Sequence, residues 1–442
     1  MKRIKQFFKF QPFSKRQRMV LNWWTESSPV EDYEGIIADG AIRSGKTVCM
    51  SLSFVLWAME SFNGQNFAMC GKTIGSFRRN VLFWLKLMLK SRGYRVTDHR
   101  ADNLVVISRG GKENNFYIFG GKDERSQDLI QGITLAGVFF DEVALMPESF
   151  VNQATGRCSV DGSKYWFNCN PDGPNHWFKK NWIDNRKAKK LLYLHFTMDD
   201  NLSLTEKIKA RYRAMYVGIF YARYIEGRWA MAEGAIYDMF DVNIHVIDQL
   251  PELEGPWFIS CDFGIQNATV FLLWRRKKGT NTWVCVNQYR YSGREKKIQK
   301  SVKQLIDGME EVFNLSPEEY ESEKICPRNI IVDPSASALI VELRQRGYSV
   351  RKAKNDVLNG IADVQVMLKD GRLLFLKNCC KETIEEIQGY RWDEKKAERG
   401  EDAPVKEADH SCDAIRYFVK TMKLVNRDDT DDDDNDEYKF YL

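Results

Sequence analysis

The sequence lacks any uninterrupted apolar run close to the ~20 residues that a membrane-spanning helix requires, although 43% of its 442 residues are hydrophobic. It also lacks a recognisable secretory signal, because residues 1–13 are basic and aromatic without an apolar core or a small-residue cleavage site. Its ten cysteines show neither a zinc-binding spacing nor a disulfide framework. We therefore expect an intracellular protein with no membrane partner, in which the cysteines are small buried apolar residues.

Charge is unevenly divided along the chain. The whole chain carries a formal +5 and residues 428–442 carry −7, so the remainder carries +12. A basic body of this size favours a polyanionic partner. The acidic end cannot bury enough apolar surface to fold alone, so we expect residues 426–442 to be disordered. The sequence leaves open whether this end is a solubilising segment, a lure for a basic surface or a mimic of DNA.

The length suits two domains, and the first half alternates short apolar runs with helical patterns. This alternation predicts an α/β domain with a parallel sheet and helices on both faces. The expected strands are residues 35–39, 67–70, 104–108, 115–119, 136–140 and 165–168, and the expected helices are residues 47–61 and a segment ending near residue 90.

The second half has a different order of elements. Three strands joined by turns, then a helix and a further strand, predict a ribonuclease-H-like sheet. These elements are residues 257–262, 269–275, 283–290, 294–313 and 329–332, followed by helices at 381–390 and 408–423. We place the first domain at 1–250, with a linker subdomain near 195–250, and the second at 251–425.

The segment Gly40–Thr47 matches G-x-x-x-x-G-K-[ST] between an expected strand and an expected helix. In this phosphate-binding loop, glycines let backbone N–H groups face phosphate oxygens, Lys46 reaches the β- and γ-phosphates, and Thr47 offers its hydroxyl to Mg²⁺. The pattern predicts a nucleoside triphosphatase. The nucleotide-binding residues expected within it are Gly40, Arg43, Ser44, Gly45, Lys46 and Thr47.

An apolar strand ends in Asp141 and Glu142, about a hundred residues after this loop. Such a pair is common by itself, but after a phosphate-binding loop in an α/β pattern it predicts a hydrolytic site. Asp141 is expected to hold the Mg²⁺ of the nucleotide and Glu142 to orient the attacking water as a base.

Three further residues have a functional interpretation beside a simpler one. Arg43 is either a transition-state arginine acting in cis or an exposed loop residue. Gln17, in Phe13-Ser-Lys-Arg-Gln17, resembles the adenine-reading glutamine of helicase-like ATPases and is otherwise a surface residue. Asn170 is either a polar sensor that couples hydrolysis to DNA contact or part of an Asn-Pro turn.

Three carboxylates in the second half are placed as a metal-dependent nuclease requires. Asp262 and Asp333 each end an expected strand, and Asp413 lies on an expected helix, where His410 shares its face. Three such acids can bind two Mg²⁺ or Mn²⁺ ions, which activate water in phosphodiester cleavage. Asp409 is either a fourth ligand or the N-cap of its helix.

Together these motifs resemble the large terminase subunit of tailed bacteriophages, from about Phe13 to about Tyr417. The resemblance also covers Glu226-Gly-Arg-Trp229 and Gly234-Ala-Ile-Tyr237, which are similar to the family's connection between domains. It implies a motor that drives double-stranded DNA into a procapsid with ATP and a nuclease that cuts concatemeric DNA. The residues carried over are Lys46, Thr47, Asp141 and Glu142, Arg43 as the cis arginine, and Asp262, Asp333 and Asp413 beside His410.

The partners implied are double-stranded DNA, the portal of the procapsid and a small terminase subunit. The family implies a homo-oligomeric ring on the portal, with a monomer when free as the alternative, acting in the host cytoplasm and absent from the mature virion. Two rival interpretations stay open. A helicase or DNA translocase requires a second ATPase-like domain after residue 250, and a structural capsid or portal-binding protein would keep the phosphate loop without activity.

Overall fold

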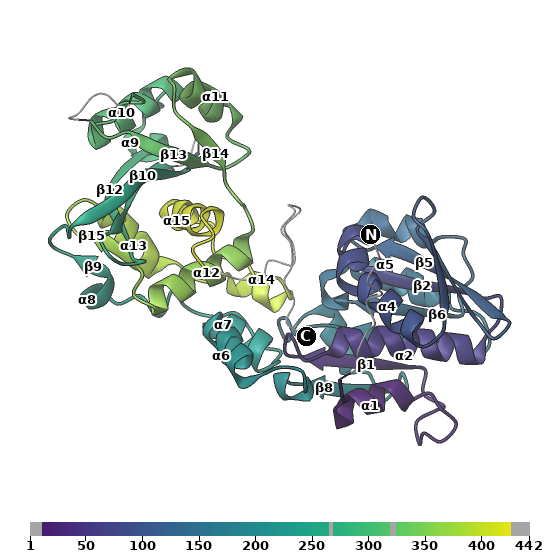
Figure 1. Ribbon diagram of the computed structural model, residues 1–442. Coiled ribbons are helices and arrows are strands. Elements are labelled where there is room, and N and C mark those ends of the chain that lie inside the picture. Colours follow the sequence, from purple (N-terminus) through teal and green to yellow (C-terminus); the bar gives the residue numbers. More distant parts are fainter. Residues whose placement is uncertain (1–10, 265–267, 319–323, 426–442) are drawn as a thin grey trace, which may run out of the picture. The chain divides into compact units, whose positions relative to one another are not determined.

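The computed structural model describes residues 11–264, 268–318 and 324–425, which divide into two compact units (Figure 1). The first unit contains the residues up to Arg213 together with Gly218–Met231, and the second contains Ala214–Val217 and the residues from Ala232 onward. The acidic end at 426–442 lies outside the described residues. Within the described ranges, no helix is long and apolar enough to cross a membrane.

The sheet of the first unit has eight strands in the order β3-β4-β5-β2-β6-β7-β1-β8. In this spatial order, the six neighbouring strands β5, β2, β6, β7, β1 and β8 run parallel. Strands β3, β4 and β5 form an antiparallel meander at one edge. The predicted parallel α/β sheet is confirmed, with β3 and β8 as strands that the sequence did not suggest. The bounds are β1 Gly35–Gly40, β2 Asn66–Gly71, β3 Arg95–His99, β4 Leu104–Arg109, β5 Lys112–Gly120, β6 Gly137–Asp141, β7 Lys164–Asn168 and β8 Leu191–Phe196.

Both faces of this sheet are covered, because neighbouring residues of a strand enter different cores. Phe139 packs in the core that contains α2, and Phe140 packs in the core that contains α5. Both cores are rich in aromatic side chains, which gain most from removal from water. The helices are α1 Lys15–Asn22, α2 Lys46–Ser61, α3 Ile74–Phe77, α4 Phe83–Ser91, α5 Glu148–Gly156 and α6 Glu206–Ala214.

The second unit contains a seven-stranded sheet in the order β14-β13-β10-β11-β12-β15-β9. Strands β10, β11 and β12 are antiparallel neighbours and β13 runs parallel to β10, so the expected ribonuclease-H-like order is confirmed. The bounds are β9 Val246–Ile247, β10 Leu253–Asp262, β11 Ala268–Lys277, β12 Trp283–Ser292, β13 Pro327–Val332, β14 Val350–Lys352 and β15 Leu373–Leu376.

Two helical layers cover this second sheet (Figure 1). Helices α10 (Val302–Phe313) and α11 (Ser337–Gln345) lie on one face, with Ile259 and Cys261 in the core between. On the other face, α15 (His410–Thr421) packs on β10 and β11 and is flanked by α12 (Val357–Lys369) and α13 (Lys381–Gly389). The residues of this unit that the sequence predicts as nuclease ligands lie on the α15 face.

The boundary between the two units lies earlier in the sequence than we expected. We placed the boundary at 250/251, whereas Ala232 and the residues after it pack with the second unit. Ile236 N donates to Tyr390 O over 2.8 Å, and β9 extends the second sheet by pairing with β15. Residues 232–250 therefore complete the second unit instead of linking to it.

The helix expected over 294–313 is wrong, because it is two helices. Helix α9 (Gly293–Lys296) ends at Lys297, whose φ of 55° is left-handed. Helix α10 begins after Ser301, which forms a capping box with Gln304. This S-x-x-Q pattern is a helix start signal that is visible in the sequence.

Phe418 of α15 is fully buried and stacks on Trp274 of β11, with ring centroids 4.6 Å apart. We expect Phe418→Ala to lower the free energy of unfolding by about 3–5 kcal/mol, through lost burial and a cavity. Differential scanning calorimetry measures this as a lower transition temperature for the second unit. Val341→Ala, at a position 53% exposed, is the control and should leave the transition in place. Equal transition temperatures for the two variants would contradict this account of the core.

Candidate functional site

The phosphate loop joins β1 to α2 as the sequence predicts. Gly40 has a φ of 123°, and a Cβ there would lie 2.0 Å from Phe196 O of β8. Gly45, with a φ of 83°, is the N-cap of α2. Both positions require glycine, because they combine left-handed backbone with close neighbours.

Lys46 is buried at the start of α2, and its ammonium group forms hydrogen bonds with other groups of the protein. Nζ lies within 2.7–3.2 Å of four acceptors, namely Gly40 O, Ala41 O, Ser44 Oγ and Asn170 Oδ1. Burial lowers the pKa of Lys46 to about 8, against the raising effects of Cys169, Asp39 and Asp141. The bond to Asn170 brings the expected sensor into contact with the phosphate loop.

Asp141 lies at the centre of a small hydrogen-bonded group. Thr47 Oγ1 donates to Asp141 Oδ1 over 3.0 Å, and Asn168 Nδ2 donates to both. Asp141 and Asn168 are register partners at the ends of β6 and β7. Burial raises the pKa of Asp141 to about 6, opposed by the hydrogen bonds from Asn168 and Thr47. Asn168 was not singled out from the sequence, since only the strand pairing reveals it.

Glu142 and Arg43 share an unusual backbone conformation. Both are exposed, with left-handed φ values of 60° and 56°. Residues other than glycine rarely adopt this conformation, and those that do are often found at functional sites. The guanidinium of Arg43 lies 5.3 Å from the ring centroid of Tyr212, and Asn201 Nδ2 donates to Arg43 O over 2.8 Å. Arg43 is therefore fixed by α6 and the loop before it.

Gln17 has a structural role that sequence reasoning missed. Its backbone N–H and side chain form the capping box of α1 with Ser14. Its amide also rests against the phosphate loop, since a Cβ on Gly45 would lie 2.4 Å from Gln17 Nε2. The capping box and the nucleotide-side position are compatible, because the amide uses its oxygen for the cap.

A buried carboxylate, Asp39, is the penultimate residue of β1 and lies beside the loop. It accepts hydrogen bonds from Tyr193 OH and Trp229 Nε1, at 2.9 and 2.7 Å, and lies 3.0 Å from His195 Nδ1. Nearby, Arg223 Nη1 donates to Asp172 over 2.9 Å and its guanidinium also donates to the carbonyl of Ala230. Sequence reasoning missed this network, because its members are far apart in the chain.

In the second unit, Asp262 and Asp333 end neighbouring parallel strands, and the residues before them, Cys261 and Val332, are register partners. Both carboxylates face α15. His410 Nδ1 lies 2.8 Å from Asp262 Oδ2, and Tyr417 OH donates to Asp333 Oδ2 over 2.8 Å. The predicted residues of both strands and of the helix therefore come to one end of the sheet.

Asp413, one turn into α15, is held by two cations that sequence reasoning missed. Arg416 Nη2 donates to Asp413 Oδ1 over 3.0 Å. Lys406 Nζ lies 3.1 Å from Asp413 Oδ2 and 2.9 Å from Asp409 Oδ2. Asp409 stands at the N-cap position, but its side chain makes no capping bond to α15. Its carboxylate is thus directed to Lys406.

The surroundings shift the pKa values of these groups in opposite directions. Burial raises the pKa of Asp262, against the hydrogen bond to His410, and that hydrogen bond raises the pKa of His410. Burial also acts to raise the pKa of Asp333, but hydrogen bonds from Ser335 and Tyr417 lower it overall. Among the described residues, no three His, Cys, Asp or Glu side chains form a group that would hold a metal ion as they stand.

Comparison with known proteins places both units in one family. Residues 37–244 match the family described as "Terminase large subunit, T4likevirus-type, N-terminal", and residues 279–421 match "Terminase RNAseH like domain". No curated protein matches the chain. The second unit is thus a ribonuclease-H-like domain, and not the second ATPase-like domain that a helicase requires.

Solved structures agree over almost the whole chain. The large terminase from a thermophilic bacteriophage is 57% identical, with a TM-score of 0.83 over 93% of this chain and 100% of that one. Its complex with ADP is similar at 56% identity, a TM-score of 0.80 and coverage of 93% and 100%. Its complex with ATP-γ-S is 56% identical, with a TM-score of 0.79 over 92% of this chain and 98% of that one. The chain therefore belongs to the large terminase family of bacteriophages, with a terminase ATPase domain and a ribonuclease-H-like nuclease domain.

Proposed function

We propose that this chain drives double-stranded DNA through the portal into a procapsid by ATP hydrolysis and cuts concatemeric DNA with its second unit. The observation that carries the first part is the contact of Thr47 with Asp141, 3.0 Å across the end of the parallel sheet. The second part rests on the three carboxylates on the α15 face. Such a motor works as a homo-oligomeric ring on the portal in the host cytoplasm, with a small terminase subunit that selects the DNA.

ATP with Mg²⁺ is the proposed ligand of the first unit, because the relative from the thermophilic bacteriophage is described in complex with ADP and with ATP-γ-S. Backbone N–H groups of the loop and Lys46 bind the phosphates, and Thr47 and Asp141 hold the cation. The cation held by these two residues would supply neutralisation of the charge that develops on the phosphates. Gln17 contacts the base from the position beside Gly45.

Glu142 orients the attacking water, and Arg43 stabilises the transition-state charge in cis. Both lie at the carboxyl end of the sheet, Glu142 directly after β6 and Arg43 inside the loop after β1. Both residues are exposed and have a left-handed backbone conformation. This suits side chains that reach a ligand instead of packing in the core.

Asn170 couples the nucleotide to the rest of the motor. It accepts a hydrogen bond from Lys46, so a phosphate that engages Lys46 competes for the same ammonium group. Two residues later, Asp172 pairs with Arg223, whose guanidinium bonds to Ala230 O in the segment that leaves the unit. Polar contacts, together with the short backbone stretch from Asn170 to Asp172, therefore join the phosphate loop to that segment.

Asp262, Asp333 and Asp413 are the proposed ligands of two Mg²⁺ or Mn²⁺ ions. The chemistry of the donor set suits hard cations, because all three groups are carboxylates at one end of the sheet. Among the described residues no such group would hold an ion as it stands, so binding would have to draw the three side chains together. Protein groups already contact two of them, since His410 lies beside Asp262 and the Lys406 ammonium beside Asp413. Ions held by these carboxylates would supply activation of a water and charge stabilisation for the leaving oxygen. His410 orients Asp262.

Glu142→Gln should abolish ATP hydrolysis, with a fall of about 10²-fold or more in kcat, while nucleotide binding persists because the amide keeps the side-chain shape. Steady-state hydrolysis and equilibrium binding of ATP-γ-S measure the two effects. Glu60→Gln, at an exposed position on α2, is the matched control and should hydrolyse ATP like the wild type. Full hydrolysis by Glu142→Gln would exclude Glu142 as the base.

Asn170→Ala should separate hydrolysis from DNA movement. The variant keeps Lys46 and Glu142, so ATP hydrolysis without DNA continues, but less DNA enters the procapsid for each ATP consumed. A packaging assay that measures protected DNA and released phosphate together gives this ratio. Asn152→Ala, exposed on α5, is the control. An unchanged ratio would leave Asn170 with its turn-forming role alone.

Asp262→Asn should abolish DNA cutting in Mg²⁺ or Mn²⁺ and leave ATP hydrolysis intact, because the two sites lie in separate units. Conversion of supercoiled plasmid to open and linear forms, with EDTA as a further negative control, measures the cutting. Asp370→Asn, exposed after α12, should cut like the wild type. Cutting by Asp262→Asn, or undiminished cutting in EDTA, would overturn the metal assignment.

A further inference from the structure

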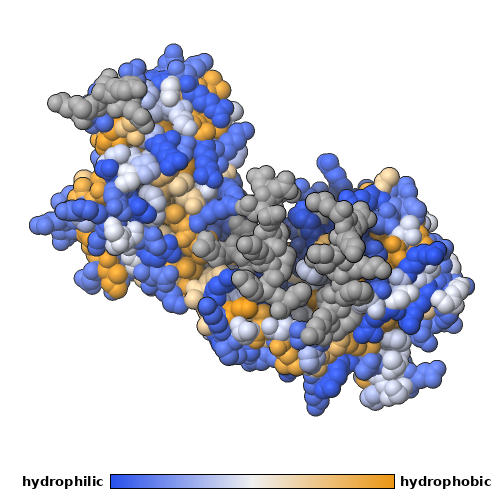
Figure 2. All heavy atoms as spheres, in the orientation of Figure 1, coloured by the Kyte–Doolittle hydropathy of each residue, from blue (hydrophilic) through white to orange (hydrophobic). Residues whose placement is uncertain are grey.

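A basic arm, residues 289–303, follows the main part of β12 and leads into α10. Figure 2 shows hydrophilic residues over most of the visible surface, so polarity alone does not single out a DNA-binding region. The sign of the charge distinguishes this arm from the rest of the polar surface. The arm has one acid, Glu295, and a net charge of +5, against +12 for all of the chain outside residues 428–442. Its basic residues are Arg290, Arg294, Lys296, Lys297, Lys300 and Lys303.

Strand register places the base of the arm level with the nuclease carboxylates. Asp262 pairs with Val270, and Val270 pairs with Arg290, so these three residues form one row across β10, β11 and β12. Two strand spacings put the Cα atoms of Asp262 and Arg290 about 10 Å apart. Arg290 Nε lies 3.6 Å from Glu386 Oε1, and Glu386 Oε2 accepts a hydrogen bond from the backbone of Ser411, the residue after His410.

The arm is held in shape by its own side chains. Tyr291 OH donates to Ile298 O over 2.7 Å and closes the loop, and Lys300 lies 4.6 Å from the ring centroid of Tyr291. Ser292 caps α9 through Glu295 N. A loop fixed in this way presents its outward cations without a large ordering cost on binding.

Three cations of the arm point to solvent. Arg294, Lys296 and Lys297 are exposed, and in the described part of the chain none of them forms a salt bridge. Glu295, the one acid between them, is bonded to both terminal nitrogens of Arg290. Ile298 is the exposed apolar residue of the arm, at 67%, and a single such side chain among cations does not form an apolar surface for a protein partner.

We propose that the basic arm binds the phosphate backbone of double-stranded DNA beside the nuclease carboxylates, with Arg294, Lys296 and Lys297 as the contacts. This inference rests on the proposed nuclease function and extends it to how the substrate is held. Duplex DNA carries one negative charge per about 1.7 Å of its axis. An arm that starts about 10 Å from Asp262 therefore meets phosphates within one helical turn of the cut.

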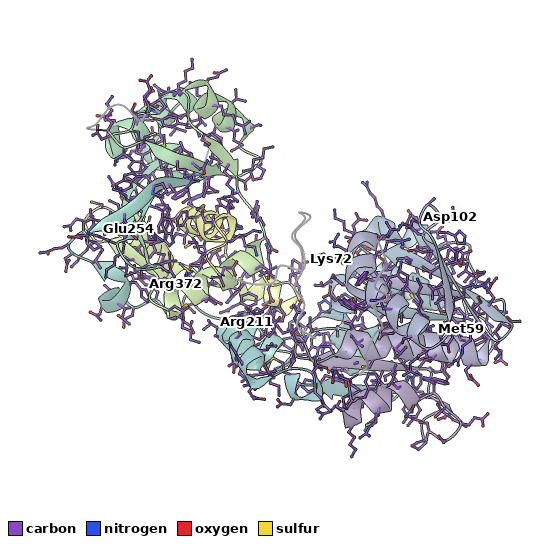
Figure 3. The ribbon with its side chains drawn as sticks, viewed as in Figure 1. Met59, Lys72, Asp102, Arg211, Glu254 and Arg372 are labelled. Atoms are coloured by element: carbon purple, nitrogen blue, oxygen red, sulfur yellow. The ribbon has the colours of Figure 1, made fainter. Side chains whose placement is uncertain are left out.

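The chain contains a matched control for this inference. Lys277 and Lys278 lie at the end of β11 opposite to the arm, and the rise of the ten-residue strand separates its two ends by about 30 Å. Glu254, which is labelled in Figure 3, lies next to them and marks that end. Lys296→Glu/Lys297→Glu and Lys277→Glu/Lys278→Glu make the same change of charge on the same β11–β12 hairpin and its continuation. Both are made in full-length protein that also carries Asp262→Asn, so DNA binding is measured without cutting.

The arm variant should bind linear duplex DNA about tenfold more weakly than its parent at about 50 mM salt, and the difference should close by about 200 mM, because two lost phosphate contacts lower the slope of log affinity against log salt by about 2. The control variant should follow the parent. With Asp262 restored, the arm variant should cut more slowly at low DNA concentration. Thermal unfolding of each variant excludes misfolding.

Equal binding by the arm variant and its parent, or equal losses in both variants, would overturn the proposal. Binding of the portal or another protein that weakens in the arm variant, with DNA binding unchanged, would assign the arm to a protein partner. Failure of the nuclease proposal is a separate result. It is an absence of cutting by the wild type in Mn²⁺, and it leaves the binding comparison in the Asp262→Asn background intact.

Discussion

Both sites depend on a property of parallel strands, whose carboxyl ends lie at one edge of a sheet. In the first unit this edge brings the phosphate loop after β1 to Asp141 at the end of β6. In the second unit it brings Asp262 beside Asp333. The side-chain period of two adds a second constraint, because a slip of one residue would turn each carboxylate to the opposite face. The chemistry is therefore fixed by strand register, and the covering helices add the remaining groups.

Burial of charge in the first unit prepares it for a charged ligand. Burial lowers the pKa of Lys46 and raises that of Asp141, so the protein alone disfavours the charged form of each group. A polyphosphate beside the ammonium and a divalent cation beside the carboxylate, as proposed above, would reverse that preference. The hydrogen bonds from Thr47 and Asn168 hold the carboxylate in place meanwhile, which limits reorganisation on binding. Ligand affinity and site geometry thus come from the same desolvated environment.

Residues that act through a local pattern could be found in the sequence, and residues that act through register could not. The phosphate loop and the strand-ending acids carry their own context, and the capping box of Ser301 and Gln304 would also have shown the break in the helix expected over 294–313. Asn168, Lys406 and Arg290 have no such signal. Their roles follow from which strand or helix lies beside them, and these pairings are long-range packing outcomes that propensity and periodicity do not encode.

The segment that leaves the first unit is bonded to the phosphate loop itself. Ile42 N donates to Tyr224 O over 2.9 Å, and a Cβ on Gly227 would lie 2.8 Å from Ala41 N, so the backbone passes directly against the loop. Trp229 is then bonded to Asp39. Because Asp39 is fully buried and engaged by several side chains, this attachment is stiff. A displacement of the loop would therefore move the segment with it without a flexible intermediate, which is the geometry that rigid-body transmission requires.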